Sequence, residues 1–179
     1  MCPQTGYTID IPAVSYPGQI ADNSDVKDVL SALAVAAKVP YGVLVVADTA
    51  NSGGFDNLAA KVPAATTDIT NVGSALGVVL ADQARAQDPA ETVATYPINS
   101  ALPCLRKGRV WVLSETAVTD GAPAFVRFSA NGALVQLGAF RADADTTSGP
   151  VDHAVALPQC AFRGAYAAPG YVVVEMDLP

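Results

Sequence analysis

The chain has 179 residues and a net charge of −7, from 10 basic and 17 acidic side chains. Charged residues make up 15% and hydrophobic residues 51% of it, whereas charged residues make up roughly 25% of an average soluble domain. This composition excludes intrinsic disorder, which needs low hydrophobicity, and the acidic balance argues against a protein that coats DNA or RNA. The length indicates one domain, or one domain with an appendage. The apolar excess then points to a membrane protein, a large core or an assembly that covers apolar surface.

The apolar stretches are too short to cross a membrane as a helix. The two richest, residues 32–37 and 39–47, are separated by Lys38 and interrupted by Pro40 and Gly42. A spanning helix needs roughly 18 to 20 apolar residues. The N-terminus also lacks the basic region and apolar core of a signal peptide. We therefore expect a soluble protein that is made in the cytoplasm.

The first 22 residues are expected to form an extended arm. Three prolines interrupt this segment, and residues 7–11 alternate apolar and polar side chains as a strand does. Prolines confine such a strand to the edge of a sheet. An apolar arm of this kind must dock on its own domain or on a neighbour. We therefore divide the chain into an arm, residues 1–22, and a β-rich domain, residues 23–179.

Two segments are expected to be helical. Asn23-Ser24-Asp25 can cap a helix, and apolar residues then recur at helical spacing until Pro40 ends the pattern. A weaker candidate runs over residues 80–86. The apolar positions of the first helix are Val26, Leu30, Leu33 and Ala37.

The rest of the chain is strand-like. Short β-branched and aromatic runs alternate with turns rich in glycine, proline and asparagine, and Asn131-Gly132 is a strong hairpin signal. This pattern predicts a mainly β fold, a sandwich or a barrel, with at most one or two short helices and with a jelly roll among the open topologies. The expected strands are residues 42–47, 76–80, 109–113, 125–128, 134–140, 161–165 and 170–176.

No motif for enzyme chemistry is found. The nucleophile-elbow pattern and the phosphate-binding glycine patterns are absent. Asp143 and Asp145 lack the companions of a calcium loop, so we interpret them as part of a solvated loop. His153 is the only histidine, which makes it a poor metal ligand. We expect no enzymatic activity, no metal and no cofactor.

The cysteines indicate a reducing compartment. Cys2, Cys104 and Cys160 form no C-x-x-C pair and are odd in number. We interpret them as buried or incidental thiols. A bridge between Cys104 and Cys160 is the unsupported alternative.

A basic cluster stands out in this acidic chain. Arg106, Lys107 and Arg109 directly precede an apolar strand that contains Trp111, which we expect to be buried. One interpretation is a charged turn, at Lys107-Gly108, ahead of a core strand. The other is a docking point for an acidic partner surface, since arginine pairs with carboxylates through two hydrogen bonds.

A series of short segments resembles the structural cement proteins of tailed bacteriophages. Each segment is only a strand with its turn, but together they follow the family's order over most of the chain. The helix-like residues 25–38 and the loop at residues 50–63 depart from the pattern. The matching segments are VSYPGQIAD at residues 14–22, PYGVLV at 40–45, LRKGRVWV at 105–112, TDGAPAFV at 119–126, GAFR at 138–141 and GYVVVE at 170–175.

The resemblance implies a non-enzymatic virion protein on the outside of an icosahedral capsid. Such a protein, commonly a homotrimer, binds at junctions between major capsid protein subunits and stabilises the mature shell, without nucleic acid or membrane as a partner. The alternative is a carbohydrate- or receptor-binding β-module on the virion. A small β-fold enzyme is disfavoured by the missing motifs. The candidate interface residues are Tyr7, Ile9, Ile11, Tyr16, Ile20, Arg106, Lys107 and Arg109.

Overall fold

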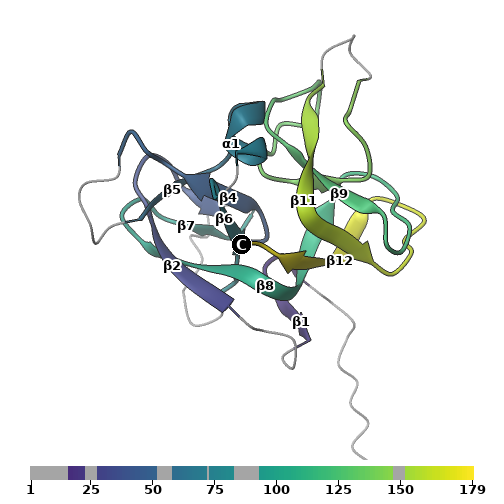
Figure 1. Cartoon of the computed structure of the whole chain (residues 1–179), viewed down its shortest axis with the longest axis horizontal. Coiled ribbons are helices and arrows are strands. Elements are labelled where there is room, and N and C mark those ends of the chain that lie inside the picture. Colours follow the sequence, from purple (N-terminus) through teal and green to yellow (C-terminus); the bar gives the residue numbers. More distant parts are fainter. Residues whose placement is uncertain (1–15, 23–27, 52–57, 72, 83–92, 147–151) are drawn as a thin grey trace, which may run out of the picture.

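The computed structural model describes residues 16–22, 28–51, 58–71, 73–82, 93–146 and 152–179 (Figure 1). This part of the chain is mainly β, as the sequence predicts, with one short helix, α1 (Thr66–Thr70). The strands are β1 (Ile20–Asp22), β2 (Asp28–Ala34), β3 (Val39–Pro40), β4 (Leu44–Ala47), β5 (Ala59–Lys61), β6 (Ala75–Val79), β7 (Thr95–Tyr96), β8 (Ala101–Ser114), β9 (Pro123–Arg127), β10 (Phe140–Arg141), β11 (Ala154–Arg163) and β12 (Gly170–Asp177).

The long strand β8 belongs to two closed rings of strands. In the first, which we call the N-terminal ring, the order β8-β2-β5-β4-β6 returns to β8. Leu105 of β8 closes this ring, because Val29 of β2 and Val78 of β6 are both registered with it. The ring is a small barrel, which is one of the two architectures expected from the sequence.

The second half of β8 closes the other ring, which we call the C-terminal ring. Its order is β8-β12-β11-β9-β10, and β10 returns to β8 through a parallel pairing of Phe140 with Ser114. β12 pairs with β8 over its whole length, from Gly170 opposite Ser114 to Asp177 opposite Lys107. The two rings therefore meet in one continuous strand, visible across the lower part of Figure 1.

Two hydrophobic clusters fill the fold, one on each side of β4 and β6. Val43 and Val45 belong to the cluster of the N-terminal ring, whereas Leu44 and Val46 belong to the cluster of the C-terminal ring. Alternate side chains of a strand point to opposite faces. An apolar run buried on both faces explains why residues 42–47 are continuously hydrophobic instead of alternating.

The expected helix from residue 25 to residue 38 is wrong. Residues 28–34 form strand β2, which pairs antiparallel with β8 from Asp28 to Leu33. Its side chains become buried at every second residue near its end, at Ala32 and Ala34. Alanine favours a helix only weakly, and pairing along β8 outweighs that preference.

Other expectations are confirmed in part. Strands β4, β6, β9 and β12 and the Asn131-Gly132 turn lie where the sequence places them. The expected strand at residues 134–140 reduces to an isolated bridge at Leu134 and to β10. Residues 80–82 are not helical, and the remainder of that expected helix lies outside the described residues. The short helix α1 is not predicted from the sequence.

Candidate functional site

The described end of the expected arm lies on the edge of β8. Ile20 is registered with Val110, the Gly18 amide donates to the Trp111 carbonyl at 2.8 Å, and the Trp111 amide donates to the Gln19 carbonyl at 2.8 Å. Tyr16 and Ile20 are thus fixed beside β8. The other candidate arm residues, Tyr7, Ile9 and Ile11, lie outside the described residues.

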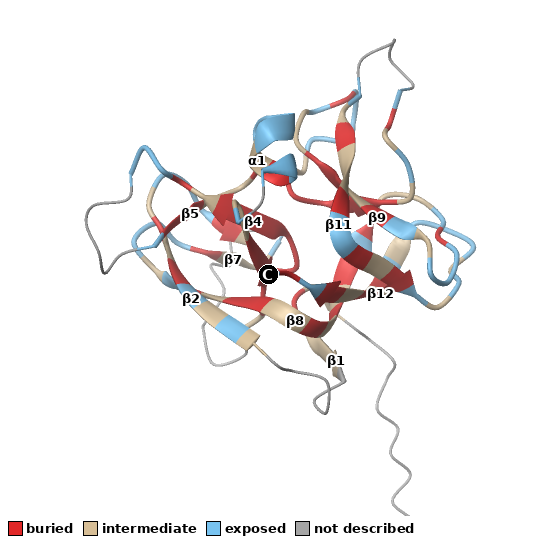
Figure 2. Ribbon diagram, viewed as in Figure 1, coloured by how far each residue is buried: buried red, intermediate tan, exposed pale blue. Residues whose placement is uncertain are grey.

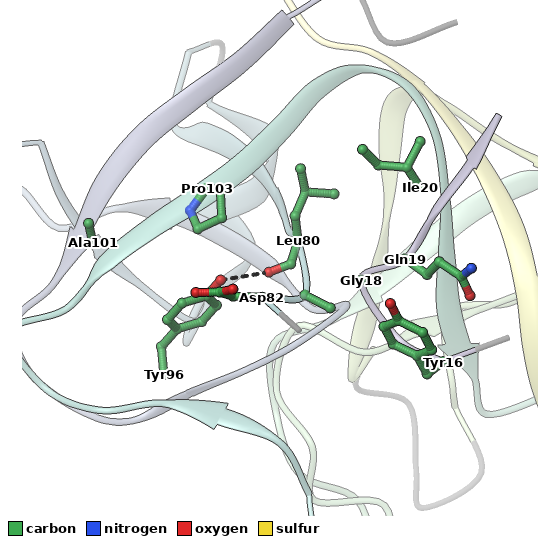
Figure 3. A pocket seen from close by; sticks show the side chains of 10 residues that line it. Tyr16, Gly18, Gln19, Ile20, Leu80, Asp82, Tyr96, Ala101 and Pro103 are labelled. Carbon is green, nitrogen blue, oxygen red and sulfur yellow. Dashed lines mark hydrogen bonds between the residues drawn. The ribbon is translucent and has the colours of Figure 1, made fainter. Parts of the chain in front are cut away.

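An open hollow of about 680 Å³ lies between this segment and the N-terminal ring (Figure 3). Tyr16 stands on one side of it, and Tyr96 and Asp82 stand on the other. The Tyr96 hydroxyl donates to the Leu80 carbonyl at 3.1 Å. Among the described residues that line the hollow, Asp82 is the only carboxylate, so they offer no pair of acids for acid-base chemistry.

The basic cluster is not a turn, because β8 runs through it without a break. Each of its three residues also forms an ion pair within the chain. Arg106 lies 3.6 Å from Asp28, Lys107 lies 3.3 Å from Asp177, and Arg109 lies 2.8 Å from Glu175. The cluster therefore serves first to link β8 to β2 and β12.

Beyond the cluster, the outward side of β8 and β12 carries aromatic and aliphatic side chains. Leu113 lies opposite Tyr171, and Trp111 lies opposite Val173. Trp111 is half-buried, so the expectation of a buried tryptophan is only partly met, and its ring packs edge-on against Tyr166 at a centroid distance of 6.4 Å. Buried residues alternate with half-buried or exposed ones in the second half of β8, and successive side chains of a strand point to opposite faces, so these side chains point outward. Figure 2 shows both kinds of residue along β8.

Glu175 links this apolar surface to two arginines. Its Oε2 atom accepts hydrogen bonds from the Nε atoms of Arg109 and Arg163, each at 2.8 Å. The hydrogen bond from Arg163, and then that from Arg109, hold the pKa of Glu175 at about 2. We call the set Arg109, Trp111, Leu113, Arg163, Tyr166, Tyr171, Val173 and Glu175 the aromatic–arginine face.

A second group of ionised residues is buried at the ends of β9 and β10, on the face opposite to the apolar cluster that contains Val126 and Phe140. The guanidinium of Arg127 lies 2.7 Å from Glu115 and 2.6 Å from Asp145, and Arg141 lies 2.6 Å from Asp145 and 2.6 Å from Asp143. Burial opposes the charge on Arg127, but the hydrogen bonds to Glu115 and Asp145 outweigh it and raise the pKa of Arg127.

This network corrects the interpretation of Asp143 and Asp145 as a solvated loop. Asp145 is 3% exposed and is held by two arginines, so it is part of the core. Asp143 stays at the surface and pairs with Arg141. No pattern in the sequence predicts this network, because folding brings its members together from separate segments of the chain.

Cys104 and Cys160 are buried, as expected, and Cys2 lies outside the described residues. Cys104 and Cys160 are free, so the alternative of a bridge between them is wrong. Burial raises the pKa of Cys104 to about 12 and raises that of Cys160 as well. Both are therefore poor nucleophiles and poor metal ligands at neutral pH.

Neither a metal-binding cluster nor a membrane-spanning helix is found in the part of the chain that the structure describes. Across residues 16–179, apart from the gaps given above, no group of three or more histidine, cysteine or acidic side chains could hold a metal ion. No helix in the same ranges is long and apolar enough to cross a membrane.

The fold and its surfaces define the class of the protein. Its buried arginines and carboxylates form ion pairs that hold strands together, and its exposed aromatic and aliphatic side chains lie on the outer side of a sheet. The chain is therefore a β protein whose described surface offers apolar and aromatic side chains for contacts with other proteins.

The chain belongs to the structural cement protein family. The family model described as "Structural cement protein (E217 gp24/Pam3 gp6)" matches residues 3–177, which confirms the resemblance seen in the sequence. Membership gives the chain a structural role in the bacteriophage virion.

A solved structure shares the fold. The chain is similar to a chain of "The capsid of Myoviridae Phage XM1", with a TM-score of 0.62 and 15% identity, over 97% of this chain and 98% of that chain. Identity this low shows the fold alone. The comparison with curated proteins gave no significant match.

Proposed function

We propose that the protein binds the outer surface of the mature icosahedral capsid, at junctions between major capsid protein subunits, and stabilises the shell. The observation that carries this proposal is the family match over residues 3–177. A protein that binds the expanded shell but not its precursor shifts the equilibrium toward the expanded state, by an amount set by the difference in affinity.

We further propose that the protein acts as a homotrimer. Three linked copies engage several capsid subunits at once, and this multivalency gives an avidity that no single contact supplies. The low charged fraction of 15% suits a subunit that covers apolar surface on assembly. The protein is made in the host cytoplasm, and it needs neither a cofactor nor a nucleic acid.

The proposed interface residues face the shell or a neighbouring copy. They comprise the alternating apolar residues of the arm and the basic cluster of β8, whose ion pairs within the chain lie at the surface and can be rearranged at small cost. The residues are Tyr7, Ile9, Ile11, Tyr16, Ile20, Arg106, Lys107 and Arg109.

A binding assay on two kinds of shell tests the proposal. Purified protein is mixed with expanded shells and, in parallel, with unexpanded precursor shells, and the bound fraction is measured by co-sedimentation. We expect saturable binding to expanded shells only, together with a higher temperature of shell disruption. Equal binding to both shells, or no binding to either, contradicts the proposal. Specific binding to a glycan array would instead support a carbohydrate-binding module.

Two deletions separate the role of the arm from the stability of the domain. Removing residues 1–15 leaves β1 and its hydrogen bonds to β8 in place, so we expect weaker shell binding with little change in melting temperature. Removing residues 1–22 also removes β1, and we expect the melting temperature to fall. Unchanged shell binding by the shorter deletion would show that residues 1–15 make no contact with the shell.

A further inference from the structure

Strand β8 is paired along both of its edges, and three separate segments share one of them. Arg109 is registered with both Asp22 of β1 and Glu175 of β12, so β1 and β12 flank β8 on opposite sides. Lys107 is shared in the same way by β2 and β12, and Ser114 by β10 and β12. β2, β1 and β10 therefore follow one another along the same edge. Among the described strands, β1 alone covers the stretch of that edge between Lys107 and Ser114.

We call residues 16–22, which contain β1, the edge strap. The Gly18 amide donates to the Trp111 carbonyl and the Trp111 amide donates to the Gln19 carbonyl, each at 2.8 Å, while Ile20 packs on the apolar cluster of the C-terminal ring. Without the strap, Trp111 would present an unpaired N–H and C=O at a sheet edge, and such an edge binds an extended chain. This stretch of β8 is therefore a strand-binding site, which the chain fills with its own segment.

Gly18 determines which sequence the site accepts. Its φ is +80°, and a Cβ atom at this position would lie 2.7 Å from both the Ala81 nitrogen and the Val79 oxygen. The Gly18 carbonyl also accepts a hydrogen bond from the Ala81 amide at 2.9 Å. Only glycine adopts this conformation without strain and without a collision. The site therefore takes an extended segment with a glycine here and an aliphatic side chain two residues later, at the position of Ile20.

The edge strap lies at the surface of the molecule. The open hollow of about 680 Å³ borders it, and Tyr16, Gly18, Gln19 and Ile20 form the strap's side of that hollow (Figure 3). Among the described strands, β1 pairs with β8 alone. The strap can therefore leave β8, and an equivalent segment can enter, while the pairing of β8 with β2, β10 and β12 stays in place.

We propose that this stretch of β8 also binds the edge strap of a second copy of the chain, so that neighbouring copies exchange straps. A second copy carries the sequence that the site already holds, so the backbone hydrogen bonds and the fit of Gly18 are reproduced after the exchange. Swapping an identical element in this way is a low-cost route to association. The inference does not depend on binding to the shell.

The chain's own strap competes with the incoming one. A segment that is tethered by a short flexible linker has an effective concentration in the millimolar range. Copies at about 1 μM therefore favour their own straps by roughly 1,000-fold, whereas exchange becomes comparable when copies are crowded to about 1 mM. The exchange thus responds to the local concentration of copies, and the dilute protein keeps its own strap.

Paired cysteines report which copy supplies the strap. Asp22→Cys with Arg109→Cys places two thiols at registered positions of β1 and β8. Cα atoms at such positions of an antiparallel pair are about 4.5–5.5 Å apart, which is within reach of a disulfide. The control, Asp28→Cys with Lys107→Cys, places the same pair on β2 and β8. Both pairs are made in the full chain with Cys2→Ser, and the oxidised products are separated on a non-reducing gel.

The two cysteine pairs should differ in how their products depend on concentration. After oxidation at about 1 mM, we expect the strap pair to form disulfides between chains in a share comparable to those within a chain, and at about 1 μM almost only those within a chain. The control pair should form disulfides within a chain at both concentrations. The inference is overturned if the strap pair stays within one chain at about 1 mM, or if the control pair links chains equally often.

An added peptide tests the same site on the full-length protein. In Gly18→Val the new side chain collides with Val79 and Ala81, so the variant's own strap is displaced. A labelled peptide with the native sequence of residues 14–24 should bind this variant at least about tenfold more tightly than it binds the unmodified protein, because the competing strap is gone. The binding is measured by fluorescence anisotropy.

Two controls make the peptide assay specific to the site. The same peptide carrying Gly18→Val should bind neither protein. The variant Gly121→Val changes a glycine that has open space around it, and it should bind the native peptide no better than the unmodified protein does. A folded Gly18→Val protein that binds neither peptide overturns the inference. If that variant does not fold, the cysteine pairs decide the question.

Discussion

The two rings share a strand but are stabilised differently. The buried cluster of the N-terminal ring consists of aliphatic side chains, Cys104 and two tyrosines, Tyr41 and Tyr96, whose ring centroids lie 4.9 Å apart. The C-terminal ring has a larger apolar cluster and, in addition, the buried ions Arg127, Glu115 and Asp145. The N-terminal ring is therefore packed around apolar side chains and tyrosines, whereas the C-terminal ring combines an apolar cluster with buried ion pairs beside it on β9 and β10.

The difference follows from how each ring closes. β6 and β8 close the N-terminal ring over two registered positions, and the Leu80 amide adds a hydrogen bond to the Pro103 carbonyl at 2.8 Å. β10 has only two residues and meets β8 at the single pair of Phe140 with Ser114. Side chains compensate for this short ladder, because Arg127 ends β9, Arg141 ends β10 and Glu115 follows β8. Ionic contacts reinforce the ring where backbone pairing is shortest.

Removing the central arginine should have the largest effect on stability. Arg127→Met leaves Glu115 and Asp145 buried without one of their cations, and breaking a buried pair in this way costs about 3–5 kcal/mol. The measurement is the free energy of unfolding in denaturant. The matched control is Arg163→Met, which breaks an exposed pair with Glu175 and should cost about 0–1 kcal/mol. Equal effects of the two substitutions would show that the buried network does not close the ring.

A glycine in the N-terminal ring gives the next largest effect. Gly77 of β6 has φ +137°, and a Cβ atom there would collide with the carbonyl of Leu105 where β6 meets β8. Gly77→Ala should destabilise the protein by roughly 2–4 kcal/mol through strain and overpacking. Gly121→Ala is the matched control, because Gly121 has φ +74° with open space around it. If the control loses as much stability, backbone strain alone explains the effect and the close approach of β6 to β8 does not.

The exposed ion pair on the C-terminal ring should give the smallest effect, and one that depends on pH. The pKa of Glu175 is lowered to about 2, so its stabilising contribution is complete above its ordinary pKa near 4.5. The contribution is lost as the pH falls toward 2, because protonation then no longer distinguishes the folded from the unfolded state. Since the pair is about one-third exposed, we expect less than about 1 kcal/mol.

Comparison with Glu175→Gln isolates this contribution. The difference in unfolding free energy between the two proteins should be present at pH 7 and should vanish near pH 2. A difference that stays constant across that range would assign the effect of the substitution to packing instead of charge.

Strands whose residues strongly favour a strand are predicted correctly from the sequence. The prediction fails where pairing with a neighbouring strand decides the structure. Residues 170–176 are apolar and β-branched, and they form β12 as expected. Residues 28–34 contain alanines and leucines that suit a helix equally well, and only pairing with β8 makes them a strand. A local preference of a few tenths of a kcal/mol per residue cannot oppose such a ladder.

The surfaces were harder to predict than the strands. The basic cluster is visible in the sequence, but its ion-pair partners Asp28, Glu175 and Asp177 lie far away in the sequence. The aromatic–arginine face depends on the register that sets Leu113 opposite Tyr171, and register is not visible in a single strand. The assignment to the cement family needed neither feature, because it rested on the order of many short segments.

The sharing of β8 has a mechanical consequence. A pull on the N-terminal ring reaches the C-terminal ring through the covalent backbone of β8, without crossing a boundary made only of side-chain contacts. Along its second half, β8 is held by the full ladder to β12, and a force directed along the strand loads these hydrogen bonds together instead of opening them one after another. The fold thus resists stretching along the one strand that both rings have in common.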